Sequence, residues 1–136
     1  MKYLLTLLFL HVTTIAFSQN KLALIVAVGD YPGASKIKPI ASVNDVRYIK
    51  AALVKNGFVE KNIDTLINST ATKTGILTAL DNKLKKIHKS DIVVIHFFFY
   101  GQQIRDQKTV EEGKDEDDGY DEALVPYDAM AKYNPT

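Results

Sequence analysis

The chain has 136 residues, which is enough for one compact domain and too few for two. Its 17 lysine and arginine residues nearly balance its 16 aspartate and glutamate residues, so charge gives no reason to expect nucleic acid or an anionic membrane as a partner. The chain contains no cysteine, which excludes a disulfide framework and leaves stability to the apolar core.

The first 18 residues have the pattern of a secretory signal peptide. Lys2 supplies a positive start, an uncharged apolar run follows it, and the small residues Ala16 and Ser18 stand where a signal peptidase reads. The alternative is a membrane anchor, but the run is short for a bilayer span and no basic cluster follows it. We therefore expect an exported protein, secreted or periplasmic, with a signal peptide at residues 1–18, a domain at residues 19–136 and no membrane attachment after cleavage.

The first element expected in the domain is a buried strand at residues 22–28. Valine, isoleucine and leucine run through it without alternation, which favours a strand covered on both faces, as in a parallel sheet. Gly29 and Gly33 follow it as turn glycines, because neither a GxGxxG nor a Walker pattern for phosphate binding is present.

A helix is expected at residues 42–57, with its start and stop signals in place. Ser42 is a good N-cap, Asp45 is its capping-box partner three residues later, and Gly57 is a C-terminal stop. The apolar residues of this helix recur at helical spacing and define one core face: Val43, Val46, Ile49 and Leu53.

A short strand at about residues 62–66 and a second helix, capped by Thr72, are expected next. Lys83 and its neighbouring lysines suit the C-terminal half of this helix, where they oppose the helix dipole. Residues 91–99 are apolar nearly throughout and predict the third strand, and residues 102–122 predict a polar, acidic loop. The core side of the second helix is expected to hold Ile76, Leu80, Leu84 and Ile87.

The alternation of strand, helix, strand, helix and strand predicts the α/β class, with an open, mostly parallel sheet and helices on both of its faces. Residues 123–128 add a short strand or hairpin arm. In such sheets catalytic groups collect at the carboxyl ends of the strands, here residues 29–39, residues 68–72 and Tyr100 onward. Because a three-stranded sheet leaves apolar edges bare, we expect the front portion of a larger domain, truncated after the third main strand and completed by a further segment or chain.

Several stretches from Lys21 to Asp128 resemble the caspase-like peptidases, and their metacaspase and bacterial caspase-homologue branch in particular. These stretches are ALIVAVGDYPG, IKPIASVNDV, TATKTGILTALDNKL and SDIVVIHFFFYGQQ. The most specific is DEDDGYDEALVPYDA, which is similar to the family's Asp-Gly-Tyr-Asp-Glu-x-Leu-x-Pro-x-Asp segment. The resemblance implies a caspase-like fold in which the C-terminal part of the domain, with the nucleophile strand, is absent.

The resemblance also implies the place of a catalytic pair, a histidine at the end of the third strand and a cysteine at the end of the next. Aligning Phe97 and Gly101 with the family's Phe-Ser-Gly-His-Gly puts Tyr100 at the histidine and Phe98 at the serine. A phenol is protonated at neutral pH and is a poor general base. Because these residues also include no cysteine, we expect no intact catalytic group, only Tyr100 in the histidine's place with Gly101 beside it.

None of the three histidines is expected to replace the missing one. His96 points the same way as Tyr100 along a period-2 strand, but it lies roughly 13 Å back and is expected to be a buried, satisfied core residue. His88 ends a helix, where an interaction with the helix dipole accounts for it. His11 leaves with the signal peptide.

The resemblance implies a specificity pocket whose acidic base selects Arg or Lys before the cut. Asp45 matches one of these acids, although the capping box predicted above would account for it equally well. Phe98 stands where the family has a small serine lining the pocket, and its ring is expected to fill that space. Asp45 and Phe98 are therefore the candidate substrate-binding residues.

The acidic run at residues 115–122 is the one candidate for a metal. The resemblance implies calcium binding there, with Asp121 at the ligand position. The run is not an EF-hand loop, because that register requires an acid where Lys114 stands. A solvated acidic loop is the alternative. No cofactor is required in either case.

The resemblance leaves two functions open within the family. The first is a non-catalytic pseudopeptidase, exported and used as a protein-interaction module. The alternative is the N-terminal part of an active endopeptidase that cleaves after Arg or Lys, with its nucleophile beyond residue 136. A generic α/β protein that binds a small ligand is disfavoured by the ordered match at residues 115–128. We expect a protein or peptide partner, and neither nucleic acid nor membrane.

Overall fold

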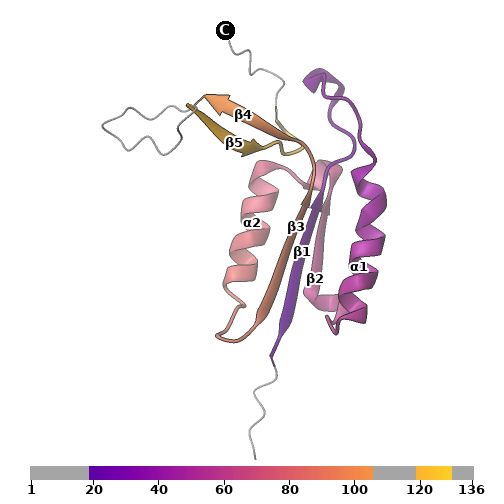
Figure 1. Ribbon diagram of the computed structural model, residues 1–136, viewed down its shortest axis with the longest axis vertical. Helices are drawn as coiled ribbons and strands as arrows, with labels where there is room; N and C mark the ends of the chain where they lie inside the picture. The colour runs from indigo at the N-terminus through magenta and orange to yellow at the C-terminus, as the bar shows by residue number, and fades with distance from the viewer. Residues whose placement is uncertain (1–18, 106–118, 130–136) are drawn as a thin grey trace, which may run out of the picture.

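The computed structural model describes residues 19–105 and 119–129. Three strands form a parallel sheet in the order β2-β1-β3, as Figure 1 shows. They are β1 (Lys21–Ala27), β2 (Ile63–Ile67) and β3 (Ile92–Phe98). The predicted parallel sheet is therefore confirmed, while the predicted signal peptide and most of the acidic loop lie outside the described residues.

The two crossover helices cover opposite faces of the sheet (Figure 1), as predicted. They are α1 (Val46–Lys55) and α2 (Lys73–Leu84). Strand β1 lies between them and is buried on both faces, because its side chains alternate between two clusters. Ala23, Ile25 and Ala27 pack on the α1 side, whereas Leu24 and Val26 pack on the α2 side.

The start of α1 differs from the predicted capping box. A 3-10 turn, η2 (Ala41–Asp45), precedes the helix, and Asp45 makes no capping hydrogen bond. The Ser42 hydroxyl instead donates a hydrogen bond to the Val28 carbonyl oxygen at 2.8 Å. The capping box is wrong because Ser42 is engaged by the end of β1, a partner distant in sequence. The core face is confirmed by Val43, Val46, Ile49 and Leu53, and the helix stop by the left-handed φ of 82° at Gly57.

Helix α2 begins as predicted but ends differently. The Gly75 N–H donates to the Thr72 side-chain oxygen at 3.0 Å, which confirms the N-cap. Leu84, expected in the core, is 67% exposed. Lys83 is buried in its place, at 3% exposure, with its ammonium 2.9 Å from an Asp64 carboxylate oxygen and donating to the Asn62 carbonyl oxygen at 2.8 Å. The last turn therefore packs through a paired lysine rather than through the predicted apolar stripe.

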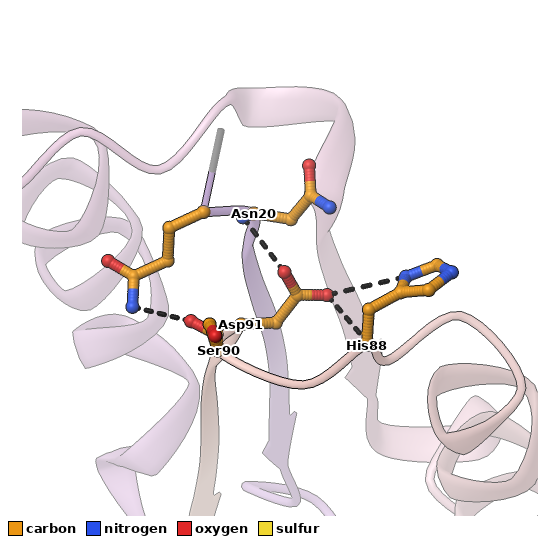
Figure 2. A network of polar contacts seen from close by, with 5 residues as sticks. Asn20, His88, Ser90 and Asp91 are labelled. Atoms are coloured by element: carbon orange, nitrogen blue, oxygen red, sulfur yellow. Dashed lines mark hydrogen bonds and ion pairs between the residues drawn. The ribbon is translucent and has the colours of Figure 1, made fainter. Parts of the chain in front are cut away.

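The turn between α2 and β3 is tied to the start of β1, as Figure 2 shows. The Asp91 carboxylate, 4% exposed, accepts hydrogen bonds from the backbone N–H groups of His88 and Asn20, each at 2.9 Å. The bond from His88, reinforced by that from Asn20, lowers the pKa of Asp91. His88 therefore lies in this turn, beyond the end of α2, and the helix-dipole role predicted for it is wrong.

A two-stranded antiparallel hairpin lies beyond the end of β3 (Figure 1). Its strands are β4 (Gly101–Arg105) and β5 (Tyr120–Leu124). A hairpin arm is present, but it lies earlier than predicted: β5 includes only residues 123 and 124 of the expected 123–128, and most of β4 and β5 occupies residues that were expected to be loop. Within the two described ranges, no helix is both long and apolar enough to cross a membrane.

Candidate functional site

The loops that follow β1 and β2 are joined at the carboxyl edge, meaning the end of the sheet where the three parallel strands finish. Asn68, the first residue after β2, accepts hydrogen bonds on its side-chain oxygen from Gly29 N–H at 2.9 Å and Asp30 N–H at 3.2 Å. A side chain at Gly29 would place its Cβ 2.8 Å from the Ile40 carbonyl oxygen, so glycine is required by close approach of the backbone. The interpretation of Gly29 as an ordinary turn glycine is therefore incomplete.

Tyr31 connects the loop after β1 with the end of β3 and with the segment after β5. Its buried hydroxyl donates to the Val125 carbonyl oxygen at 2.9 Å and accepts the Tyr100 N–H at 3.4 Å. Burial raises the pKa of Tyr31, so the hydroxyl keeps its proton and remains a donor. Tyr31 was not among the predicted site residues, although an aromatic side chain with a hydroxyl shortly after a buried strand is a signal for it.

The segment after β5 is hydrogen-bonded to residues that follow each of the three parallel strands. Val125 N–H donates to the Tyr100 carbonyl oxygen at 2.9 Å, and Tyr127 N–H donates to the Ala71 carbonyl oxygen at 3.0 Å. The Asp128 carboxylate accepts the N–H of Lys73 at 2.8 Å, at the start of α2. The last part of the DEDDGYDEALVPYDA motif therefore has a structural function that its sequence alone did not reveal.

Tyr100 lies in an apolar cluster on the α2 side of the sheet. It packs there with Phe97 and Phe99, and its ring centroid is 6.0 Å from that of Tyr31. Phe98 packs on the opposite side, against the α1 cluster. The aromatic run of β3 is thus divided between the two cores by strand alternation, and the end of the strand is packed from both sides.

His96 lies on the α1 side of β3, with its ring centroid 4.0 Å from that of Phe98. It was expected to point the same way as Tyr100, and that expectation is wrong because β3 ends at Phe98 and the period-2 pattern does not continue to Tyr100. His96 was also expected to be satisfied, but its buried Nε2 has no hydrogen-bond partner among the described residues. His88 lies at the opposite end of the sheet, so neither histidine is near Tyr100.

Asp45 is exposed just before α1, at the carboxyl edge. Its carboxylate makes no capping bond. The capping role that was the alternative to substrate binding is therefore not observed for Asp45. Phe98 is only half-buried, and it packs on the cluster that also contains Val43 and Val46, the apolar neighbours of Asp45 in η2 and α1. The ring thus lies on the α1 side of the sheet, and its filling of a substrate pocket stays a prediction.

Asp121 lies in β5, opposite Ile104 of β4, and is half-buried. Among residues 19–105 and 119–129, no group of three histidine, cysteine, aspartate or glutamate side chains gathers in a way that could hold a metal ion. Residues 115–118, which carry the rest of the acidic run, lie outside the described residues. Calcium binding at Asp121 therefore stays a prediction.

A shallow cavity of about 270 Å³ lies between the start of α2 and the end of β5. It is lined by Lys73, Ile76, Leu77, Leu124 and Pro126. Leu77 and Leu124 are exposed, at 57% and 55%, whereas Ile76 beside them is buried. The cavity adjoins the anchored segment after β5, so the carboxyl edge carries an apolar surface as well as a packed interior.

A family model described as the metacaspase, peptidase C14 domain, matches residues 21–134. The chain belongs to this family. Metacaspase-4 of Arabidopsis thaliana is 33% identical over 115 residues, which cover 80% of this chain and 26% of that protein. Metacaspase-1 of Candida albicans is 32% identical over 117 residues, which cover 82% of this chain and 26% of that protein.

Metacaspase III c of Phaeodactylum tricornutum is 39% identical over 89 residues, covering 62% of this chain and 24% of that protein. The chain thus spans about a quarter of the length of the curated relatives it matches. Membership of the metacaspase family confirms the predicted resemblance and makes this chain part of a caspase-like peptidase domain. The assignment of Tyr100 to the histidine position, and of Asp45 and Phe98 to a substrate pocket, stays a prediction.

Proposed function

We propose that this metacaspase-family domain is exported and acts as a non-catalytic pseudopeptidase, a module that binds a protein or peptide. The observation that carries the proposal is the environment of Tyr100, the residue aligned with the family's histidine. Its N–H is bonded to Tyr31 and its ring lies in an apolar cluster. The ring is half-buried among apolar side chains, which are not the surroundings of an exposed general base.

The chemistry of the described residues supports the same conclusion. A phenol cannot become a cation that stabilises a thiolate, which is the role the family gives to histidine. His96 packs on the other side of β3, and His88 lies at the other end of the sheet. The 136 residues contain no cysteine to be activated. No cofactor is required for a binding role, and calcium at the acidic loop, with Asp121 as a ligand, is a separate proposal.

The cavity beside α2 supports a binding role. It offers exposed Leu77 and Leu124 with Lys73 at its rim, a combination suited to an apolar peptide segment that carries an acidic group. Neither nucleic acid nor a membrane is proposed as the partner of this surface. We expect Leu77→Asp to abolish partner capture, and Leu84→Asp, an equally exposed leucine at the far end of α2, to leave it unchanged.

One observation favours the alternative, an active endopeptidase that cleaves after Arg or Lys with its nucleophile beyond residue 136. Asp45 is exposed and makes no capping bond, so its carboxylate is available to a basic substrate side chain. Phe98 weighs against this alternative, because the alignment puts its bulky ring at the position where the family has a small serine lining the pocket. The two functions differ in one measurable property, turnover.

The deciding experiment uses the protein purified from its native source and fluorogenic Arg and Lys peptides, with and without calcium. We expect no turnover in either condition. Cleavage that is lost in a Tyr100→Phe variant would overturn the pseudopeptidase and make the phenol part of a working site. The intact mass of the same preparation tests export, because removal of residues 1–18 would leave Gln19 as the first residue.

A further inference from the structure

The outer face of α1 carries a shallow groove that takes no part in the core or in the carboxyl edge. Helix α1 forms the outer layer on its side of the sheet (Figure 1), and its buried residues Val46 and Leu53 face inward. Val54 is 45% exposed, so the floor of the groove is apolar and open to solvent. The groove has a volume of about 460 Å³ and is lined by Arg47, Lys50, Ala51, Val54 and Lys55 of α1 and by Glu60 of η3 (Glu60–Asn62).

The charges in this groove are one-sided. Three of its lining side chains are cationic and one is a carboxylate. The Glu60 carboxylate lies 2.7 Å from the Lys50 ammonium, so these two groups neutralise each other. Arg47 and Lys55 form no ion pair among residues 19–105 and 119–129. The groove therefore holds two cations without an acidic partner, one in the first turn of α1 and one at its last residue.

The Arg47 side chain is held in place by the residue next to it. Its guanidinium lies over the Tyr48 ring, 4.5 Å from the ring centroid, and donates to the Tyr48 hydroxyl oxygen at 2.6 Å. This contact uses one of the five N–H donors of the guanidinium and restrains a side chain that otherwise has many rotamers. Binding of a carboxylate therefore costs less conformational entropy at Arg47 than at an unrestrained arginine.

Helix geometry fixes the distance between the two unpaired cations. Arg47, Ala51 and Lys55 are spaced four residues apart and follow one face of α1. At about 1.5 Å per residue, Arg47 and Lys55 are about 12 Å apart along the helix axis. An extended chain covers nearly the same span between its first and fifth residues, at about 3.3 Å per residue, and its alternate side chains point the same way. The groove therefore matches an acidic, an apolar and an acidic side chain at alternate positions of an extended segment.

We propose that this groove binds an extended acidic segment of a partner protein. The two carboxylates pair with Arg47 and Lys55, and the apolar side chain between them packs on Ala51 and Val54. A helical segment would have to order about eight residues to cover the same span, and helices this short are marginal in water. Nucleic acid fits less well, because the Glu60 carboxylate repels phosphates and the apolar floor offers them no contact. The inference does not rest on the proposed function, since an inactive and an active domain would carry the same groove.

The test measures the fluorescence anisotropy of labelled peptides titrated with the 136-residue chain. The matching probe is the fluorescein-labelled peptide Gly-Asp-Ser-Leu-Ser-Glu-Gly, which has an acid, a leucine and an acid at alternate positions. One control peptide has the same composition with adjacent acids, Gly-Asp-Glu-Ser-Ser-Leu-Gly, and a second has Asn and Gln in place of the acids. We expect the matching probe to bind best, and to lose most of its binding at about 1 M salt, where exposed charges are screened.

Two double variants with the same change of net charge localise the binding. Arg47→Gln with Lys55→Gln removes the unpaired cations of the groove, whereas Lys38→Gln with Lys86→Gln removes two exposed lysines that do not line it. We expect the groove variant to bind the matching probe about tenfold more weakly than the native chain, and the control variant to differ from it by less than about twofold. Glutamine is a good helix former, so the substitutions in α1 preserve the helix.

Amide chemical shifts in the NMR spectrum of the native chain depend on no variant. We expect the matching probe to shift the amide signals of Ala51 and Val54 and to leave that of Leu77 on α2 unchanged. Shifts at Leu77 and Leu124 instead would overturn the groove and place the peptide in the cavity beside α2.

Other results would overturn the groove as well. They are no binding with about 1 mM probe, equal binding of the two acidic peptides, and equal losses in the two double variants. Binding of duplex DNA that is lost in Arg47→Gln with Lys55→Gln, without a preference among the peptides, would assign the groove to nucleic acid. None of these outcomes bears on the turnover of Arg and Lys peptides, which tests the proposed function separately.

Discussion

At the amino edge of the sheet, where β1, β2 and β3 begin, carboxylates paired with lysines or backbone N–H groups lie beside the strands, whereas at the carboxyl edge a buried tyrosine and backbone hydrogen bonds join the strand ends. The contacts of Asp91 belong to the first group and those of Tyr31 to the second. Both edges belong to one small sheet, yet the contacts of the first centre on a carboxylate and those of the second on a neutral hydroxyl. The end of β3, next to Tyr100, is therefore held by neutral groups, whereas the start of β1 is held by a carboxylate.

The largest expected effect is at Lys83, the charged group that is buried on the amino-edge side. Lys83→Ala removes its pairing with Asp64 and its bond to the Asn62 carbonyl oxygen. Because Asp64 is half exposed and can be rehydrated, we expect the free energy of unfolding to fall by about 2–3 kcal/mol, below the cost of breaking a fully buried pair. Urea denaturation measures this loss of stability, with Lys85→Ala as the control for an exposed ion pair. A loss no larger than that of the control would contradict the role of burial.

Tyr31→Phe tests the carboxyl edge. It leaves the Val125 carbonyl oxygen without its donor and the Tyr100 N–H without its acceptor, so we expect the free energy of unfolding to fall by about 1–2 kcal/mol. Tyr48 is an exposed tyrosine on α1, so Tyr48→Phe should change the free energy of unfolding by less than about 0.5 kcal/mol in the same urea measurement.

The Tyr31→Phe variant should also differ from the native chain in how its stability depends on pH. Since burial raises the pKa of Tyr31 in the folded state, its contribution is complete below the ordinary tyrosine pKa, about 10, and is lost as the pH rises through the folded value. The native chain should therefore lose stability above about pH 10 more steeply than Tyr31→Phe. Parallel alkaline limbs in the two proteins would contradict burial of this hydroxyl.

Asp91 gives the opposite pH window at the amino edge. Its pKa is lowered in the folded state, so its stabilising effect is complete above the ordinary aspartate pKa, about 4, and is lost as the pH falls through the folded value. Asp91→Asn should flatten the acid limb of the stability curve and leave the alkaline limb unchanged. Circular dichroism melts across pH measure both limbs, and an unchanged acid limb would show that the contacts in Figure 2 do not form in solution.

The smallest expected effect is on activity. Tyr100→His in these 136 residues should give no cleavage of Arg or Lys peptides, because the chain contains no thiol for the imidazole to activate. Turnover by this variant, measured against the native chain as the blank, would reveal a nucleophile other than cysteine.

Local signals in the sequence predicted the elements well. Thr72 caps α2, Gly57 ends α1, and the core face of α1 is the predicted one, because capping and helical periodicity depend on residues within a few positions. Continuous apolar runs likewise predicted β1 and β3 as strands of a parallel sheet. The predictions that failed concern partners distant in sequence: Ser42 is engaged by Val28, just after β1, and Lys83 by Asp64 of β2.

The candidate site also combines features that the local sequence predicts with contacts that only the folded chain reveals. The sequence by itself determined that Tyr100 follows the third strand, that no cysteine accompanies it, and that the chain has the metacaspase pattern. Only the tertiary structure decided that Tyr31 holds the end of β3, that His96 faces the other core, and that Asp45 is free of a capping role. Hydrogen bonds to neighbours in the chain are encoded locally, whereas the fate of a side chain at a strand end depends on which distant segment packs against it.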